Sequence, residues 1–129
     1  MSSAEKLADT IEATFTTIQH TRMDGVPVMN TALSVRLLGL RAWNGFWLGT
    51  LLTPWFMNLI LLPETPDDTP LASGTKRTFR FPSGSFEFIR GNEQDIGGFW
   101  MCSLFSPVFE FTDQETAEAC AAAALAELF

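Results

Sequence analysis

The feature that most constrains the fold is a run without charged residues from Ala42 to Pro63, AWNGFWLGTLLTPWFMNLILLP. Its length permits a membrane-spanning helix, because about 18 consecutive apolar residues can cross a bilayer. Two dipeptides interrupt the run. Asn44-Gly45 is typical of a tight hairpin turn, since both residues tolerate a positive φ, and the proline of Thr53-Pro54 lacks a backbone donor. We therefore expect strand, turn, strand, helical turn and strand, with membrane association as an alternative.

A two-residue loop at Asn44-Gly45 also predicts the register of the first hairpin. Trp43 would pair with Phe46, Ala42 with Trp47, and Arg41 with Leu48. One face would then carry Leu38, Leu40, Ala42, Trp47 and Leu51, and the other Leu37, Trp43, Phe46, Leu48 and Leu52. Both faces are apolar, unlike those of a sheet with one solvated side. Each face must therefore be covered, whether by a helix, a partner or a second subunit.

Helical patterns stand at both ends of the chain. Residues from Ser2 to about His20 have capping-box spacing in Ser2 and Glu5. Their apolar stripe is Leu7, Ile11, Phe15 and Ile18. Thr112 and Glu115 form a second capping box before a C-terminal helix. The apolar face of that helix carries Ala117, Cys120, Ala121, Ala124, Leu125 and Leu128.

The middle of the chain completes a predicted sheet. Residues 64–74 are acidic and rich in proline, which indicates a loop. A second hairpin is expected about Ser83-Gly84, with Phe81 opposite Phe86 and Arg80 opposite Glu87. A further strand spans Phe99 to Phe105. The expected fold is one α+β domain over residues 1–129, a two-layer sandwich. Its mainly antiparallel sheet has about five or six strands, and both helices pack on one side.

Composition excludes several functions. The net charge of −7 disfavours nucleic acid, which needs a clustered basic surface. Glu5, Asp9 and Glu12 occur where a signal peptide would be apolar, so a cytoplasmic location is expected. Cys102 and Cys120 are then free thiols in the core, although a contact between them stays open. A lone His20 and two separated cysteines form no metal-ligand pattern, and no catalytic or cofactor motif is present. We expect neither catalytic residues, nor a metal, nor a cofactor.

A partner-binding role is predicted for the turn of Thr53, Pro54, Trp55, Phe56 and Met57. Threonine as N-cap and proline at the first position favour a helical start. A turn at the edge of a sheet would leave its bulky side chains only partly buried. Exposed aromatic residues and methionine are favoured at protein interfaces. Burial of the same residues in the core is the alternative interpretation.

Three blocks of the sequence, taken together and in order, resemble one protein family. They are LLTPWFMNLILLP (51–63), FPSGSFEF (81–88) and MCSLFSP (101–107). The chain is similar to the [NiFe]-hydrogenase assembly chaperones of the HybE and HupJ type. The resemblance implies a cytoplasmic, non-enzymatic α+β protein that binds the precursor of the large or small hydrogenase subunit before twin-arginine export.

The resemblance has limits. Some relatives carry a rubredoxin-like domain with paired CxxC motifs, and this sequence has none, so an iron-linked role is not implied. It transfers no catalytic or partner-binding residue. Which subunit is bound, whether a signal peptide is recognised, and whether the protein forms a homodimer stay open. A small-ligand-binding domain and a membrane-associated protein are the competing classes.

Overall fold

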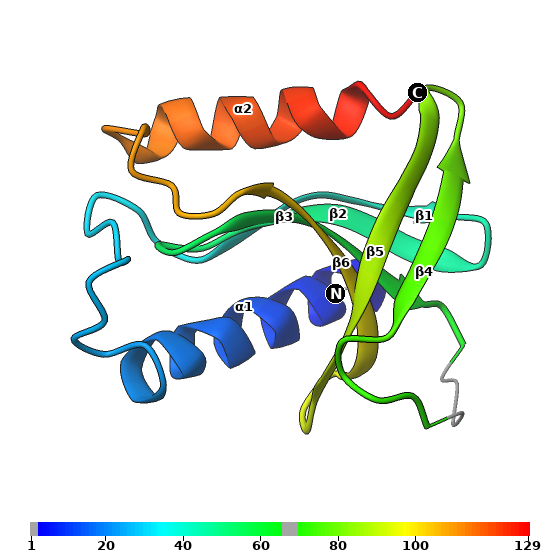
Figure 1. The fold of residues 1–129 in the computed structure, drawn as a ribbon, viewed down its shortest axis with the longest axis horizontal. Coiled ribbons are helices and arrows are strands. Elements are labelled where there is room, and N and C mark those ends of the chain that lie inside the picture. The colour runs from blue at the N-terminus through cyan, green and yellow to red at the C-terminus, as the bar shows by residue number, and fades with distance from the viewer. Residues whose placement is uncertain (1–2, 66–69) are drawn as a thin grey trace.

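The computed structural model describes residues 3–65 and 70–129, which form one six-stranded antiparallel sheet with a helix at each end of the chain (Figure 1). The elements are α1 (Ser3–Thr21), β1 (Arg36–Trp43), β2 (Phe46–Leu52), β3 (Met57–Pro63), β4 (Lys76–Phe81), β5 (Gly84–Glu93), β6 (Gly97–Phe105) and α2 (Gln114–Ala126). The strand order is β1-β2-β3-β6-β5-β4. The α+β class and the number of strands are as expected.

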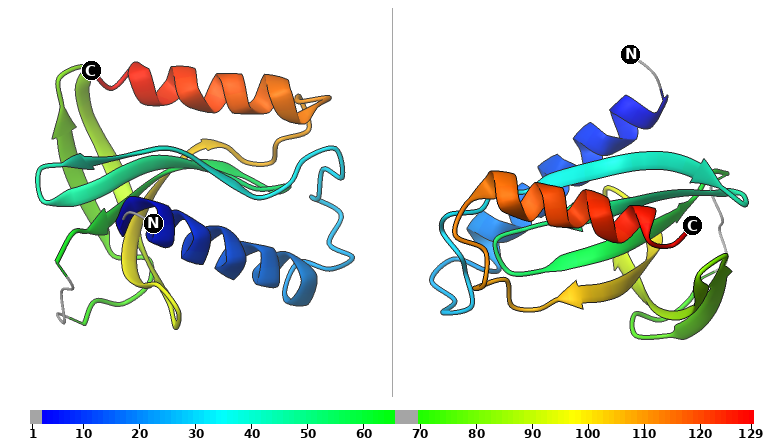
Figure 2. Two further views of the ribbon diagram at one scale, coloured as in Figure 1. Left: turned by 180° about the vertical axis from the view of Figure 1, so that it is seen from behind. Right: turned by 90° about the horizontal axis from the view of Figure 1, so that it is seen from above.

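The two helices cover opposite faces of the sheet (Figures 1 and 2). Ile11, Phe15 and Ile18 of α1 pack on one face with Leu51 and Ile60. On the other face, α2 packs its small residues against the opposite side of β2 and β3. That contact comprises Ala117, Ala121, Leu52 and Met57. The expected two-layer sandwich with both helices on one side is therefore wrong. Both faces of β2 and β3 are apolar, so each needs its own cover.

The first hairpin has the predicted register at its turn, with Trp43 opposite Phe46 and Arg41 opposite Leu48. The register then shifts between Leu38 and Arg41, where Gly39 has a φ of 66°. This β-bulge inserts one residue and exchanges the faces beyond it. Leu37 therefore packs on the α1 side and Leu38 on the α2 side, the reverse of the expected assignment.

The second half of the sheet coils until its edges approach each other. Strands β4 and β5 run across the direction of β1 to β3 (Figure 1). The rings of Trp43 in β1 and Phe81 in β4 stack with centroids 4.2 Å apart, and Phe46 meets Phe79 at 5.4 Å. Leu125 and Leu128, at the end of α2, close this aromatic cluster.

The hairpin of β4 and β5 differs from its predicted register by two residues. Its turn is Pro82-Ser83, which leaves Phe81 opposite Gly84. Proline suits the first position of such a turn because its φ is fixed. A shift of two keeps the alternation, so Phe79, Phe81, Phe86 and Phe88 share the face of the aromatic cluster. Arg80 lies opposite Ser85, not Glu87, and Glu87 instead pairs with Lys76 at 4.0 Å.

The helix ends agree only in part with the predicted caps. The capping role of Ser2 lies outside the described residues. At α2 the N-cap is Asp113, whose carboxylate accepts a hydrogen bond from the Thr116 N–H at 2.7 Å. The predicted cap, Thr112, is one residue too early. Aspartate and threonine are both favoured at this position, so composition alone does not separate them.

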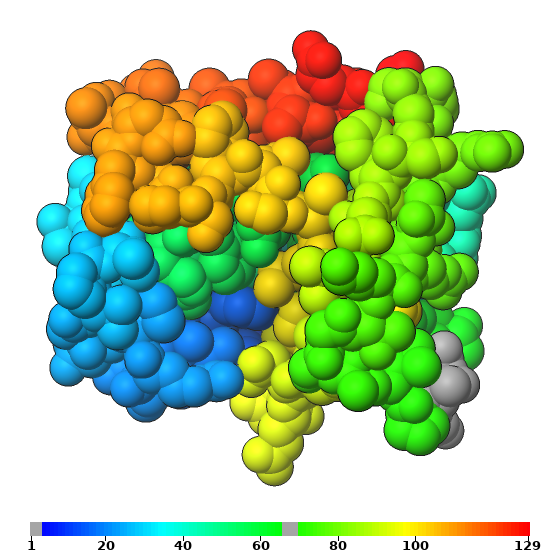
Figure 3. Space-filling view, in the orientation of Figure 1, coloured from blue at the N-terminus to red at the C-terminus, as the bar shows by residue number. Residues whose placement is uncertain are grey.

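Residues 22–35, between α1 and β1, cover one end of the sheet (Figure 3, blue to cyan). Asn30 holds this segment in place. Its backbone N–H donates to Pro54 O at 2.7 Å. Its side-chain amide donates to the carbonyls of Val108 and Phe111 at 2.9 and 2.8 Å. The backbone and the side chain of one residue thus tie the segment to the turn after β2 and to the connection before α2.

Candidate protein-binding surface

The turn between β2 and β3 has the capping function predicted for Thr53. Its Oγ1 accepts the N–H groups of Trp55 at 3.2 Å and Phe56 at 3.0 Å. The Thr53 N–H donates to Phe56 O at 2.8 Å, which closes the turn. The chain bends here without a helical turn, because β3 already begins at Met57.

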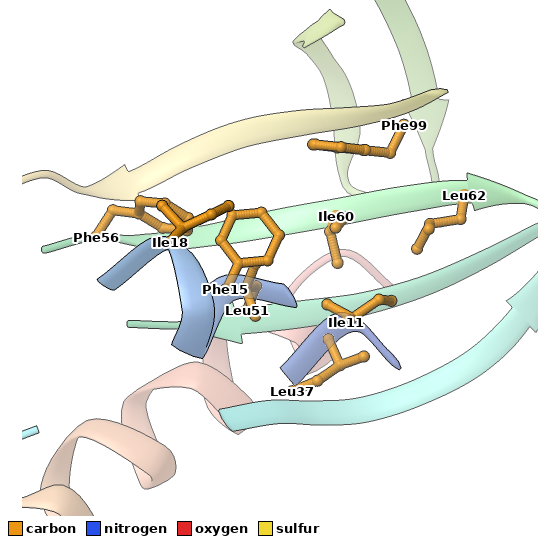
Figure 4. Close-up of a cluster of buried hydrophobic side chains, with 9 residues drawn as sticks. All are labelled: Ile11, Phe15, Ile18, Leu37, Leu51, Phe56, Ile60, Leu62 and Phe99. Atoms are coloured by element: carbon orange, nitrogen blue, oxygen red, sulfur yellow. The ribbon is translucent and has the colours of Figure 1, made fainter. Parts of the chain in front are cut away.

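The partial burial expected for this turn is wrong for four of its five residues. Thr53, Pro54, Phe56 and Met57 are buried, and Trp55 alone is half-buried. Phe56 points into the core beneath α1 (Figure 4), where its ring meets that of Phe15 edge-on at 6.0 Å. Met57 packs on the other face with Ala117 and Ala121 of α2, and the segment 22–35 contacts the turn through the hydrogen bond from Asn30 to Pro54 O. Only Trp55 retains surface that a partner could contact.

Helix α1 does not extend over the second half of the sheet, which is formed by β6, β5 and β4. Ile60, Met101 and Ile89 form one row across β3, β6 and β5 on the α1 side. Ile60 is fully buried, Met101 is half-buried, and Ile89 is 47% exposed. We call Asn58, Ile89, Met101 and Ser103 the open sheet surface. Apolar side chains in this row thus pass from the core to solvent without a covering element.

A polar group without a partner lies at the edge of the open sheet surface. The Asn58 Oδ1 atom is buried and accepts no hydrogen bond from the described residues. Its amide nitrogen faces the Met101 sulfur at 3.6 Å. A buried acceptor without a donor costs about 1–3 kcal/mol.

A groove of about 420 Å³ runs beside α1, between Thr10, Ala13, Thr14 and Thr17 and the residue Asp95. The groove thus lies between α1 and the turn that joins β5 to β6. The hydroxyls of Thr10 and Thr14 already donate to helix carbonyls. A small-ligand site needs several convergent polar groups. This groove offers few, so the geometry favours a surface for a macromolecule over a small-ligand pocket.

The titratable side chains do not assemble into a reactive centre within residues 3–65 and 70–129. No three His, Cys, Asp or Glu residues there are grouped to hold a metal ion. Cys102 and Cys120 are free thiols in different parts of the core. Burial raises the pKa of the Cys102 thiol, which disfavours the reactive thiolate.

The long uncharged run forms the end of β1, then β2 and β3, and so belongs to the sheet. Across the part of the chain that the structure describes, none of the helices combines the length and apolarity needed to span a bilayer.

A family model described as "[NiFe]-hydrogenase assembly, chaperone, HybE" matches residues 6–129. The chain belongs to this HybE family. The hydrogenase expression/formation protein HupJ of Bradyrhizobium diazoefficiens is 41% identical over 120 residues, 93% of this chain and 70% of that protein. A probable rubredoxin HupJ of Rhodobacter capsulatus is 42% identical over 118 residues, 91% of this chain. The match spans only 42% of the length of the R. capsulatus protein.

The fold is also that of a solved HybE protein. The solution structure of HybE from Escherichia coli superposes with a TM-score of 0.76, at 20% sequence identity. The match covers 95% of this chain and 76% of the E. coli chain. The coiled sheet with a helix on each face is thus an arrangement that distant HybE sequences share.

Proposed function

We propose that this HybE-family chain binds the precursor of a [NiFe]-hydrogenase subunit, large or small, during assembly in the cytoplasm and before twin-arginine export. It acts as a single non-catalytic domain over residues 1–129. Membership of an assembly-chaperone family supports this proposal, as do relatives named for hydrogenase expression and formation. The described residues offer a surface for a protein and no assembled reactive centre, which agrees with a binding role.

The precursor docks on the open sheet surface, with Trp55 beside it as an aromatic anchor. The observation that carries this placement is the row from buried Ile60 to exposed Ile89, which ends without cover. Trp55 packs against the same α1-side cluster. Apolar centres with a few polar groups are typical of protein interfaces.

Two substitutions test the placement. Ile89→Asp puts a charge on the apolar row, and Trp55→Ala removes the anchor. Each is expected to weaken precursor binding by at least tenfold, because an aromatic anchor often contributes about 2 kcal/mol. Binding is measured by titration of the purified precursor, and the melting temperature is taken on the same preparations.

Phe109→Asp is the matched control, because Phe109 is an exposed apolar residue (56%) outside this surface. It should bind the precursor as the wild type does. Normal binding by both Ile89→Asp and Trp55→Ala would refute the placement. The placement would also be refuted if Ile89→Asp and Trp55→Ala lose binding only because they unfold.

A further inference from the structure

We propose a second recognition site on the α2 side of the sheet, where Arg77 and Arg90 lie around Trp100 and bind a carboxylate group of a peptide segment. We call these three residues the arginine–tryptophan site. The proposal rests on the proposed function only for the source of the peptide, which is the protein partner. Its location does not depend on the open sheet surface, since the side chains belong to the aromatic cluster on the other face.

Arg90 is a buried guanidinium held in a fixed orientation. Only 5% of the residue is exposed. It lies opposite Trp100 across β5 and β6, with its Cζ atom 5.3 Å from the indole centroid. Its Nε donates to Asn92 Oδ1 at 3.3 Å. Asn92 is itself anchored by hydrogen bonds from its amide to Leu71 O and Ser73 Oγ.

A glycine makes room for this guanidinium. Gly98, in β6, has no side chain, and a Cβ atom there would collide with the terminal nitrogen of Arg90. The guanidinium thus occupies the space that a side chain at position 98 would fill. This slot gives Arg90 a defined position, in contrast to a solvated surface arginine, whose long side chain moves among rotamers.

The terminal donors of Arg90 are unused. The ion pairs within the described residues are Arg22–Glu93, Arg36–Glu12 and Lys76–Glu87, and none involves Arg77 or Arg90. In the same residues, Asn58 Oδ1 is the one fully buried side-chain nitrogen or oxygen without a partner. The terminal nitrogens of Arg90 therefore reach the surface. A buried charge without a counter-ion is costly, and an anion at this opening would offset that cost.

Arg77 adds a second cation over the same rings. Its Cζ atom lies 4.6 Å from the ring centroid of Phe79 and 5.9 Å from that of Trp100. Arg77 is exposed, so its guanidinium covers the aromatic cluster and faces solvent. The Cζ atoms of Arg77 and Arg90 lie 5.9 and 5.3 Å from the same indole centroid, so an anion at the opening over Arg90 would be attracted by both charges. This positive site is local, because the whole chain carries a net charge of −7.

The geometry favours the carboxylate of a peptide over other anions. A guanidinium fork matches the two oxygens of a carboxylate. Phe46 is half-buried beside the Arg77 guanidinium and offers apolar contact to the residues that flank such a carboxylate. A long polyanion such as nucleic acid would meet repulsion from the acidic remainder of the protein. The occupant is thus an acidic side chain within an apolar peptide segment.

The test uses defined probes on the full chain. Acetyl-Leu-Glu-Leu-amide, its glutamine counterpart and inorganic phosphate are each titrated while NMR follows the Trp100 indole N–H and the Arg90 Nε–H. The glutamate peptide is expected to shift both signals saturably, with an affinity at least tenfold above that of the glutamine peptide. Equal shifts with glutamine, or no shifts, would overturn the proposal. Tighter binding of phosphate than of the glutamate peptide would replace it with an inorganic anion site.

Matched variants separate recognition from folding. Arg77→Gln should weaken glutamate-peptide binding at least fivefold, whereas Arg80→Gln should leave it unchanged. Arg80 is exposed and lies on the opposite face of the same strand. Gly98→Ala should displace the Arg90 guanidinium and weaken glutamate-peptide binding more than Arg77→Gln does. Equal binding by wild type, Arg77→Gln and Gly98→Ala would overturn the assignment. A wild type that binds the hydrogenase precursor but neither peptide would refute this site and leave the chaperone function standing.

Discussion

At the scale of single residues, Thr53 shows how one hydroxyl directs a whole turn. Its Oγ1 accepts two backbone N–H groups and donates to Phe56 O at 3.2 Å, and the residue is fully buried. The capping role follows from the residue type and its place before proline. The cover of this turn includes the segment 22–35, which reaches it through the hydrogen bond from Asn30, 23 positions before Thr53, to Pro54 O. The local sequence therefore predicts the capping hydrogen bonds of Thr53 but not the segment that packs over the turn.

We predict that Thr53→Val destabilises the protein by about 1–3 kcal/mol, because two buried N–H groups lose their acceptor while the side-chain volume is kept. Thr53→Ser, which retains the hydroxyl, is the control and should cost less. Urea denaturation of the three proteins gives the comparison. A Thr53→Val protein as stable as the wild type would show that the turn does not depend on this hydroxyl.

At the scale of elements, the hairpins show where sequence reasoning succeeds and where it stops. Asn44-Gly45 allows one tight turn and predicts the adjacent register correctly. The segment after Phe81 holds two adjacent turn-forming dipeptides, Pro82-Ser83 and Ser83-Gly84, and a shift of two residues keeps the phenylalanines on one face. Alternation alone cannot decide between these registers. The bulge at Gly39 depends on a distant helix, since a Cβ there would meet Leu125 of α2.

Helix α2 gives an element-scale prediction that depends on pH. The backbone N–H of Thr116 holds the pKa of the Asp113 carboxyl below its usual range. A lowered pKa in the folded state adds stability above the unfolded pKa, and this is lost as the pH falls through the folded value. Asp113→Ala should therefore lower the melting temperature at pH 7, and the difference should shrink near pH 3.

Asp113→Asn is the control for this prediction, because asparagine also accepts a capping hydrogen bond but does not titrate. Thermal unfolding of the wild type, Asp113→Ala and Asp113→Asn between pH 3 and pH 7 separates the effect of the capping hydrogen bond from that of the carboxylate charge. A gap between Asp113→Ala and the wild type that is constant over this range would show that the carboxylate charge does not contribute.

At the scale of the whole molecule, each helix covers the half of the sheet formed by β1, β2 and β3. The other half coils around its own aromatic cluster on one side. On its α1 side it leaves Ile89 exposed and Met101 half-buried at the edge of the α1 cluster. The two apolar faces of the first hairpin, β1 and β2, predicted that both sides need cover. Which half stays open could not be predicted, because it depends on the coiling that brings Phe81 to Trp43.

In the proposed complex, the open sheet surface holds the hydrogenase subunit precursor. Hydroxyl-radical footprinting tests this placement most directly, because the oxidation of a side chain reports its contact with solvent. The chain is oxidised alone and in complex with the purified precursor, and each site is quantified by mass spectrometry. We predict that the oxidation rates of Trp55, Ile89 and Met101 fall at least threefold in the complex and that the rate of Phe109 is unchanged. Protection of Phe109 while Ile89 and Met101 oxidise at their free rates would contradict it.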